Sequence, residues 1–500
     1  MSNLIAKEYQ GFEEIKQIDK GGNEFWFARE LAPVLECTEW RNFSKVFERA
    51  ILACKNSGFN IDDQFINVSK LIEHGKGGKR DIIDYKLYKK ILSMKHLIYC
   101  LLVTCVLFAC GDKQAGQGRF IRVSGKDLVT PDGKKFFIQG INLGNWLNPE
   151  GYMFLFSNAN SYRLINDAFC EMVGPEFTAW FWREFKKNYI TKEDLAYIKQ
   201  TGMNSIRIPF HYKLFTDEDY MGLTTRQDGF EMIDKLLGWC REEGLYVIFD
   251  MHDAPGGQTG DNIDDSYGYP WLFECEESQV LCCDIWRRIA ARYANDPIVL
   301  GYDLLNEPIP SHFSHLNAKL EPFYKRCVAA IREVDKNHII LLGGSNWNNN
   351  FSVFADWKFD DKIMYTCHRY WCDTLQNNIQ DFVAFRDKVN LPMYMGETGE
   401  NTDEWVGAWR RLLERNNIGW HFWPYKKMPP RACMMIINPP ENWNVIVDYT
   451  KKDRSSFAKI REARPDQAVV RKAMTDLLEN IKFANCRKNA GYTQALGMKP

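Results

Sequence analysis

The feature that most restricts the fold of this chain is a repeated alternation of short apolar runs with helix-patterned stretches. Eight runs rich in β-branched and aromatic residues follow residue 119, each closing on a polar or aromatic cluster, at 136–146, 205–210, 246–253, 299–308, 339–347, 362–371, 392–399 and 419–425. Amphipathic stretches separate them, including 192–201, 230–243, 283–293, 320–334 and 377–388. Strands that alternate with helices form a parallel sheet, and eight such units favour a closed (β/α)8 barrel, or TIM barrel.

An open, doubly wound sheet is the alternative, because it has the same alternation. Sheets that bind nucleotides carry a GxGxxG or GxxxxGK[ST] loop after a strand, and none of the eight runs is followed by one. We therefore expect a barrel over 119–483 and a C-terminal tail over 484–500. The active site of such a barrel lies at the carboxyl ends of its strands.

Two glutamates end opposing runs of the expected barrel. Glu307 stands in Asn-Glu-Pro at the end of the fourth run, and Glu397 stands in Gly-Glu-Thr at the end of the seventh. Either glutamate alone could equally be an ion-paired structural residue. Together, across a barrel mouth, they can flank a glycosidic bond, one as a protonated acid and the other as an ionised nucleophile, provided that their surroundings separate their pKa values.

Other residues at the ends of the runs suit the same chemistry. Arg207 is a permanent cation that can keep a neighbouring nucleophile ionised. The remaining candidates offer hydrogen bonds or ring faces to a sugar, and they are His252, Asn306, His368, Tyr370, Trp423, Trp146 and Trp371. A single histidine or tryptophan in such a place is more often a packing residue, so the hypothesis rests on the whole set.

The strings IRIPF, MHDAPGG, LLNEP, CHRYW, MGETG and WHFWPYKK resemble, in order and spacing, glycoside hydrolase family 5. The resemblance implies a retaining hydrolase of β-glucans or β-glucosides without cofactor or metal. It also implies Glu307 as acid/base and Glu397 as nucleophile, with Arg207, His252, Asn306, His368, Tyr370 and Trp423 around the cleaved sugar. The string GINLGNWLNP resembles the branch with exo-β-1,3-glucanases and β-glucosidases. Asp253 departs from the family, where many members have histidine or asparagine.

The composition agrees with a neutral substrate. Lysine and arginine total 64 against 65 acidic residues, a net charge of −1, which provides no field to attract nucleic acid. The 16 tryptophans could serve both the core and the apolar faces of sugars. We expect a monomer whose partner is a β-glucan or oligosaccharide.

Two other functions compete with this interpretation. A metal-dependent barrel hydrolase could use His252, Asp253 and His368, but it would leave both glutamates idle. A non-catalytic carbohydrate-binding lipoprotein would tolerate the loss of either glutamate, and both are present. The long loop after Asp253 carries Asp261, Asp264 and Asp265 without the spacing of a calcium loop.

The segment 94–110 is patterned like a lipoprotein signal peptide. An apolar run over 97–109 follows Met-Lys-His and is followed by Cys110. It is too short to span a bilayer, which needs about 20 residues, and it has the length of the apolar region of a signal peptide. A buried helix is the alternative. We expect lipidation of Cys110, a polar linker over 111–118, and a secreted lipoprotein anchored in a bacterial cell envelope. Such signals are normally read at the front of a chain, whereas this one lies inside it.

We therefore expect residues 1–93 to be a separate, truncated piece. The segment 12–43 resembles the start of the DNA-damage-inducible protein D family. A basic, glycine-rich turn at 74–80 permits nucleic-acid contact, although an exposed loop with solvated lysines is the simpler interpretation. We expect a small α+β extension without catalytic residues, so that a DNA-damage function would rest on an incomplete segment.

Overall fold

The computed structural model describes residues 14–34, 65–74, 78–88, 117–430 and 432–500, which belong to two compact units, 1–116 and 117–500. The first unit contains an antiparallel sheet in the order β1-β2-β4-β3. Its elements are β1 (Gln17–Ile18), β2 (Glu24–Phe27), α2 (Ala28–Val34), β3 (Phe65–His74) and β4 (Gly78–Tyr88). This is the small α+β extension expected from the sequence.

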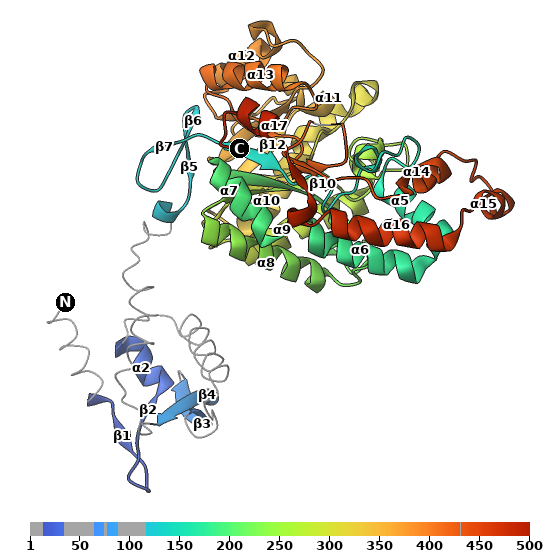
Figure 1. Ribbon diagram of the computed structural model, residues 1–500. Coiled ribbons are helices and arrows are strands. Elements are labelled where there is room, and N and C mark those ends of the chain that lie inside the picture. Colours follow the sequence, from blue (N-terminus) through green and yellow to red (C-terminus); the bar gives the residue numbers. More distant parts are fainter. Residues whose placement is uncertain (1–13, 35–64, 75–77, 89–116, 431) are drawn as a thin grey trace. The chain divides into compact units, whose positions relative to one another are not determined.

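The second unit is a closed barrel of eight parallel strands, which confirms the predicted fold (Figure 1). Each strand pairs in parallel with its neighbours, and β15 closes the ring against β8. The strands are β8 (Gln139–Asn142), β9 (Ser205–His211), β10 (Tyr246–Asp253), β11 (Val299–Asp303), β12 (Ile339–Gly343), β13 (Ile363–His368), β14 (Met393–Glu397) and β15 (Gly419–Phe422). Nearly all their residues are buried because side chains fill the interior and helices cover the outside.

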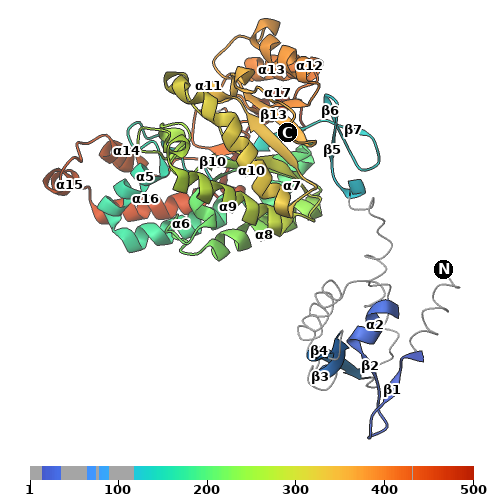
Figure 2. The same cartoon turned by 180° about the vertical axis from the view of Figure 1, so that it is seen from behind.

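Helices follow the strands around the barrel (Figure 2). Residues with strong capping chemistry begin two of them: Thr191 and Thr225 each form a reciprocal capping box with an aspartate three residues later, which satisfies free N–H groups of the first turn. The helices that follow strands β8 to β14 include α7 (Lys192–Thr201), α8 (Arg226–Glu243), α9 (Glu276–Tyr293), α10 (Leu320–Val334), α12 (Gln380–Val389) and α13 (Asp403–Arg415).

A second group of helices, not predicted from the sequence, packs together beside the barrel (Figure 1). It contains α5 (Tyr162–Val173), α6 (Pro175–Tyr189), α14 (Trp443–Thr450) and α16 (Gln467–Asn480), while α15 (Phe457–Ala463), between α14 and α16 in the chain, has no buried residue. Trp443 joins this group to the loop after β8, because its ring stacks on Phe156 at 5.9 Å and its Nε1 donates to the carbonyl oxygen of Phe154 at 2.9 Å.

Short sheets complete the unit at both ends of its sequence. The strands β5 (Arg122–Ser124), β6 (Asp127–Val129) and β7 (Lys135–Phe136) form a meander, from which Leu128 packs against barrel residues such as Ile248 and Leu300. Near the other terminus, β16 (Lys426–Lys427), β17 (Met435–Ile436) and β18 (Arg487–Lys488) form a sheet, and α17 (Ala490–Ala495) packs on α13. The residues 484–500 are therefore part of the packed unit instead of the tail that we expected.

The predicted signal segment 94–110, including Cys110, lies outside the described residues. Among the described helices, none has both the length and the apolar character that crossing a bilayer requires.

Candidate active site

Glu307 and Glu397 face each other at the carboxyl ends of the barrel strands. Glu397 is the last residue of β14, and Glu307 lies in the loop after β11 with a φ of 49°. This left-handed conformation is uncommon for a residue with a side chain, and such strain is concentrated at functional sites. A carboxyl oxygen of Glu307 lies within 4.8 Å of one of Glu397. Both residues line a cleft of about 580 Å³.

Arg207, on β9, is the centre of charge beneath the cleft. Its Nη1 donates to Oε1 of Glu397 at 2.5 Å, its Nη2 lies 2.9 Å from Oδ1 of Asp250, and its Nε donates to Oδ2 of Asp303 at 3.0 Å. The side chains of Arg207, Asp250 and Asp303 have no exposed surface. One buried cation therefore serves three carboxyl groups from three other strands, and an ion pair in such surroundings is screened little by water.

Two amides complete the contacts of this arginine, and a histidine links one of them to Asp250. Arg207 donates from Nη1 to Oδ1 of Asn142 at 3.1 Å and from Nη2 to Oδ1 of Asn306 at 3.0 Å. The other side of Asn306 places Nδ2 3.3 Å from Nε2 of His252, whose Nδ1 lies 2.8 Å from Oδ2 of Asp250. Burial lowers the pKa of His252 to about 4, so the neutral ring donates from Nδ1 to Asp250 and accepts from Asn306 at Nε2.

The surroundings separate the pKa values of the two glutamates. Burial raises the pKa of Glu307 well above its usual range, and the negative charge of Glu397 raises it further. Burial also raises the pKa of Glu397, but the guanidinium of Arg207 opposes that rise. The site therefore favours a protonated Glu307 beside an ionised Glu397, which is the pair that double displacement needs.

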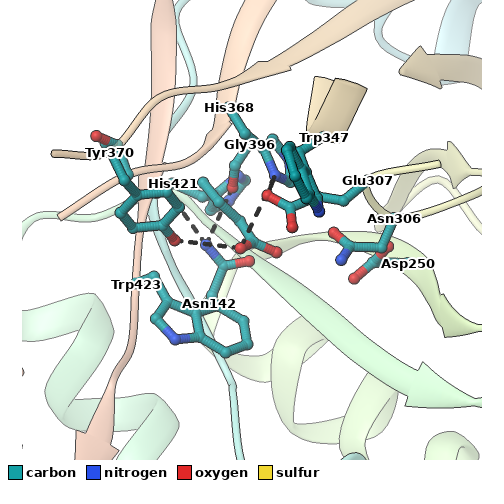
Figure 3. A network of polar contacts seen from close by, with 12 residues as sticks. Asn142, Asp250, Asn306, Glu307, Trp347, His368, Tyr370, Gly396, His421 and Trp423 are labelled. Carbon is teal, nitrogen blue, oxygen red and sulfur yellow. Dashed lines mark hydrogen bonds and ion pairs between the residues drawn. The ribbon is translucent and has the colours of Figure 1, made fainter. Parts of the chain in front are cut away.

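His368 and Tyr370 hold these two carboxyl groups in place (Figure 3). Nδ1 of His368 lies 2.8 Å from Oε1 of Glu307, and the hydroxyl of Tyr370 donates to Oε2 of Glu397 at 3.2 Å. Burial lowers the pKa of His368 well below its usual range. A neutral imidazole next to Glu307 adds no positive charge that would help Glu307 to ionise.

Trp423 forms a flat surface within the cleft. It stacks on His252 with ring centroids 5.5 Å apart and planes 12° apart. Its Nε1 donates to the hydroxyl of Tyr152 at 2.7 Å. Gly144 makes this position possible, since a Cβ there would lie 2.7 Å from the indole ring. An indole held in this way presents an apolar face on which a sugar ring can stack.

The cleft also contains residues that were not predicted from the sequence. Glu150 and Glu400 line it, and Lys427, 3% exposed, forms an ion pair with Glu400 at 2.6 Å. Burial raises the pKa of Glu150 to about 8, with further contributions from the charges of Glu397 and Glu400. The other lining residues that we did not single out are Tyr152, Ile263, Trp347, Asn349 and Arg369. Glu150 and Lys427 lie in or next to strings that we had already noted, GINLGNWLNP and WHFWPYKK.

The structure places the predicted candidates at three levels. His252, His368, Tyr370, Trp371 and Trp423 line the cleft with the two glutamates. Arg207 and Asn306 lie directly beneath it, 0% and 1% exposed. Trp146 corrects our expectation: it is 2% exposed and donates from Nε1 to the carbonyl oxygen of Lys186 at 2.7 Å, so it is a core residue without access to a sugar in the cleft.

Two groups of side chains in the described part of the chain have ligand atoms close enough to hold a metal ion. They are Asp250, His252 and Glu397, and Glu307, His368 and Glu397. In the first group, the oxygens of Asp250 and Glu397 already contact Arg207, and the remaining oxygen of Asp250 contacts His252. The guanidinium thus supplies the positive charge that a metal would bring. Asp253, the third residue of the metal-dependent alternative, belongs to neither group.

Comparison with known proteins agrees with this geometry. A family model described as Cellulase (glycosyl hydrolase family 5) matches residues 167–428. A beta-xylosidase of Phanerodontia chrysosporium is 32% identical over 253 residues, 50% of this chain and 52% of the relative. Endoglucanase C of Acetivibrio thermocellus is 26% identical over 354 residues, 58% of this chain and 92% of the relative. A probable glucan 1,3-beta-glucosidase A of Aspergillus fumigatus is 29% identical over 245 residues, 47% of this chain and 55% of the relative. The chain thus spans about half the length of the first and third relatives.

Proposed function

Because the chain belongs to glycoside hydrolase family 5, the cellulase family, we propose that it hydrolyses the β-glucosidic bonds of β-glucans or β-glucosides with retention of configuration. The observation that carries this proposal is the distance between the two glutamates. A separation of about 5–5.5 Å suits covalent double displacement, whereas inverting enzymes leave room for a water molecule at about 6.5–9.5 Å. Carboxyl oxygens of Glu307 and Glu397 within 4.8 Å of each other favour the first arrangement.

In the first step, Glu397 attacks the anomeric carbon of the bound sugar. The bond from that carbon to the leaving oxygen breaks while Glu307 gives its proton to this oxygen. Arg207 and Tyr370 hold the two oxygens of Glu397 and so fix the direction of attack. The product is a glycosyl ester on Glu397.

In the second step, water attacks the same carbon from the side that the leaving group has vacated. Glu307, now ionised, takes the proton of this water, and the ester oxygen of Glu397 leaves. The amide of Asn306, held by Arg207 and His252, is suited to contact the 2-hydroxyl of the sugar, an interaction that strengthens in the transition state.

The charge of the cleft favours neutral sugars. Glu150, Glu307, Glu397 and Glu400 line it, Lys427 is already paired with Glu400, and Arg369 is paired with Asp381. Burial raises the pKa values of Glu150 and Glu307, which keeps both groups neutral, so a sugar carboxylate would meet the ionised Glu397 as a like charge and find no unpaired cation among the described residues that line the cleft. The flat ring of Trp423 and the names of the endoglucanase and glucan 1,3-beta-glucosidase relatives support glucose in a β-linkage.

Two alternative functions are less well supported. A non-catalytic carbohydrate-binding protein has no need for two carboxyl groups with separated pKa values. A metal ion held by Asp250, His252 and Glu397 would have to displace Arg207 from Asp250 or Glu397, and the expected set of His252, Asp253 and His368 is neither of the two groups of described residues whose ligand atoms lie close together.

The proposal is tested by incubating the purified protein with β-glucan oligosaccharides of 1,3, 1,4 and 1,6 linkage. We expect reducing sugar to be released equally with and without a chelator. Proton NMR of the first product should show the β-anomer. An α-anomer formed first would contradict retention, and a requirement for added metal would favour the metal-dependent alternative.

We further propose that translation from Met94 yields an exported lipoprotein with Cys110 at its mature N-terminus, anchored in a cell envelope. This rests on the sequence of 94–110 alone. A fatty-acid analogue should label the protein expressed from Met94 and should not label Cys110→Ser. Equal labelling of the two proteins would count against the proposal.

A further inference from the structure

A row of aromatic side chains leads from the catalytic cleft across three neighbouring loops. It begins at Trp347, which lines the cleft, and continues through rings whose successive centroids lie 6.2, 4.4, 5.2 and 4.7 Å apart. We call this row the aromatic track; its members in order are Trp347, His312, Phe313, Tyr269 and Trp271. All five are at least partly exposed, and Trp271 at the far end is 48% exposed.

The track lies on the side of the barrel that carries the proposed acid. Its residues come from the loops after β10, β11 and β12, which are adjacent strands, and Glu307 is on the second of these loops. Backbone hydrogen bonds join the three loops. The N–H of Ile309 donates to the carbonyl oxygen of Gln258, in the loop after β10, at 3.0 Å, and the N–H of Asn346 donates to the carbonyl oxygen of Ile309 at 2.7 Å. These hydrogen bonds hold the loops after β10 and β12 against Ile309, two residues from Glu307.

The backbone at Trp347 is held in an uncommon conformation. Asn346, Trp347 and Asn348 have φ values of 54°, 53° and 60° within α11 (Ser345–Asn348). Three successive left-handed residues with side chains are unfavourable, and they persist only where the surroundings impose them. Here Nδ2 of Asn349 donates to the carbonyl oxygens of Asn346 and Trp347 at 3.1 and 2.7 Å. The turn directs the indole to the cleft.

The loop from β10 is packed onto the track as well. A Cβ at Gly260 would lie 2.8 Å from the ring of Phe313 and 3.0 Å from Cα of Tyr269, so only glycine allows this approach. Lys319 holds the end of the track that is far from the cleft, because its Nζ donates to the carbonyl oxygen of Phe273 at 3.1 Å. Phe273 and Trp271 belong to the same short helix, η5 (Trp271–Phe273).

The other end of the cleft has a different character. Glu150, Tyr152, Glu400 and Trp423 come from the loops after β8, β14 and β15, which are adjacent to one another on the other side of the ring. That side offers carboxyl groups, the hydroxyl of Tyr152 and the single indole of Trp423, whereas the track offers five neighbouring rings. Since Glu307 delivers its proton to the leaving oxygen, the portion of the substrate that leaves must lie on the side of Glu307 and of the track.

From this arrangement we propose that the aromatic track binds the sugar residues on the leaving-group side of a β-glucan chain, so that the enzyme cleaves chains carrying several residues beyond the scissile bond. This inference rests on the proposed function. Amphipathic rings in a row suit the apolar faces of successive sugars, and remote binding of this kind can be used to lower the barrier at the reacting centre.

The experiment measures kcat/KM for a short aryl β-glucoside and for β-glucan oligosaccharides of increasing length. The variants are Trp347→Ala, at the start of the track, and Trp271→Ala, at its end. Phe457→Ala is the matched control, because this phenylalanine is 81% exposed on α15 and outside the track. Thermal unfolding of each variant verifies that it is folded.

For the wild type, we expect kcat/KM to rise with chain length. Trp271→Ala should reduce the ratio of kcat/KM for the longest chain to that for the aryl glucoside by roughly three- to tenfold, the range expected for one aromatic contact. Trp347→Ala should reduce the ratio already for the shortest oligosaccharide, and Phe457→Ala should keep the wild-type ratio.

A ratio that neither tryptophan variant changes would overturn the inference, as would a wild-type kcat/KM independent of chain length. These results leave the proposed function in place. If the wild type hydrolyses no β-glucoside of any length, the proposed function itself fails.

Discussion

Nη1 of Arg207 donates to Oε1 of Glu397 at 2.5 Å, and the same guanidinium contacts Asp250 and Asp303 in a region without exposed surface. The arginine therefore has two effects, since it lowers the pKa of Glu397 and compensates carboxyl groups that would otherwise be buried alone.

Replacing this cation should impair both activity and stability. We expect Arg207→Met to lower kcat by on the order of a hundredfold or more and to reduce the free energy of unfolding by about 3–5 kcal/mol, because buried charges lose their partner. The acidic limb of the pH profile of kcat/KM should move to higher pH, since Arg207 opposes the rise in the pKa of Glu397. Denaturant unfolding and pH profiles measure both effects. An unshifted acidic limb in a folded, partly active variant would contradict this role of Arg207.

Removal of the nucleophile and removal of the acid should have different consequences. Glu397→Ala should abolish turnover of all substrates. Glu307→Ala should still form the glycosyl ester from substrates with good leaving groups, and the ester should persist for want of a base. Azide needs no deprotonation, so it should restore turnover of Glu307→Ala and give a β-glycosyl azide.

With Glu397→Ala, azide can attack only from the face that the carboxyl group has vacated, which gives the α-glycosyl azide. NMR of the two products distinguishes them. If the two variants gave the opposite anomers, the roles of Glu307 and Glu397 would be exchanged.

Glu150 should make the stability of the protein depend on pH. Its pKa in the folded protein is about 8 against 4.5 for the free side chain, so the folded state keeps a proton that the unfolded chain loses. Stability is then highest below pH 4.5, falls by at most about 1.4 kcal/mol per pH unit as the pH rises, and levels off above pH 8. The advantage of Glu150→Gln over the wild type in the free energy of unfolding should grow over this interval. An equal difference at pH 4 and pH 9, measured by denaturant unfolding, would refute this prediction.

Gly144→Ala should disturb the cleft without disturbing the barrel. The new Cβ would lie 2.7 Å from the indole of Trp423, so the ring must shift, and we expect kcat/KM to fall roughly tenfold to a hundredfold. Gly238→Ala on α8 is the control, because a Cβ there meets no atom within 4 Å. It should keep full activity and a melting temperature at or above that of the wild type. Full activity of Gly144→Ala would show that the position of Trp423 is not critical.

Residues 117–500 should fold and act without the first unit. They form one compact unit that contains the barrel and every residue of the cleft. We expect this fragment to match the full chain in kcat/KM and to unfold cooperatively. An insoluble or inactive fragment that recovers when residues 1–93 are added would contradict the independence of the two units.

The strands were predictable because a buried parallel strand is a short apolar run with recognisable ends. The run 246–253 coincides with β10, and 192–201 coincides with α7. Other runs were predicted too long: 299–308 became β11 (Val299–Asp303) plus the loop that carries Asn306 and Glu307. Asn306 and Glu307 lie just beyond the point where the hydrogen bonding of β11 to its neighbouring strands stops. The apolar pattern of the sequence continues past that point because the loop after β11 is buried as well.

The parts that escaped prediction depend on contacts between distant segments. Nothing in the local pattern distinguishes Trp146, which is buried against Lys186, from Trp423, which lines the cleft. Glu150 becomes a cleft residue only through the path of the loop after β8. The helices α5, α6 and α16 have to pack on each other, and no sequence period reveals such a partnership.

The contacts of Arg207 also connect chemistry with assembly. This residue on β9 joins groups on β8, β10, β11 and β14, strands that are up to 255 residues apart in the chain, from Asn142 to Glu397. A folding intermediate with its helices formed but its barrel not yet closed would lack the charge balance that keeps Glu397 ionised beside a protonated Glu307. The return of activity during refolding is therefore a signal of ring closure itself, later than any signal of helix content.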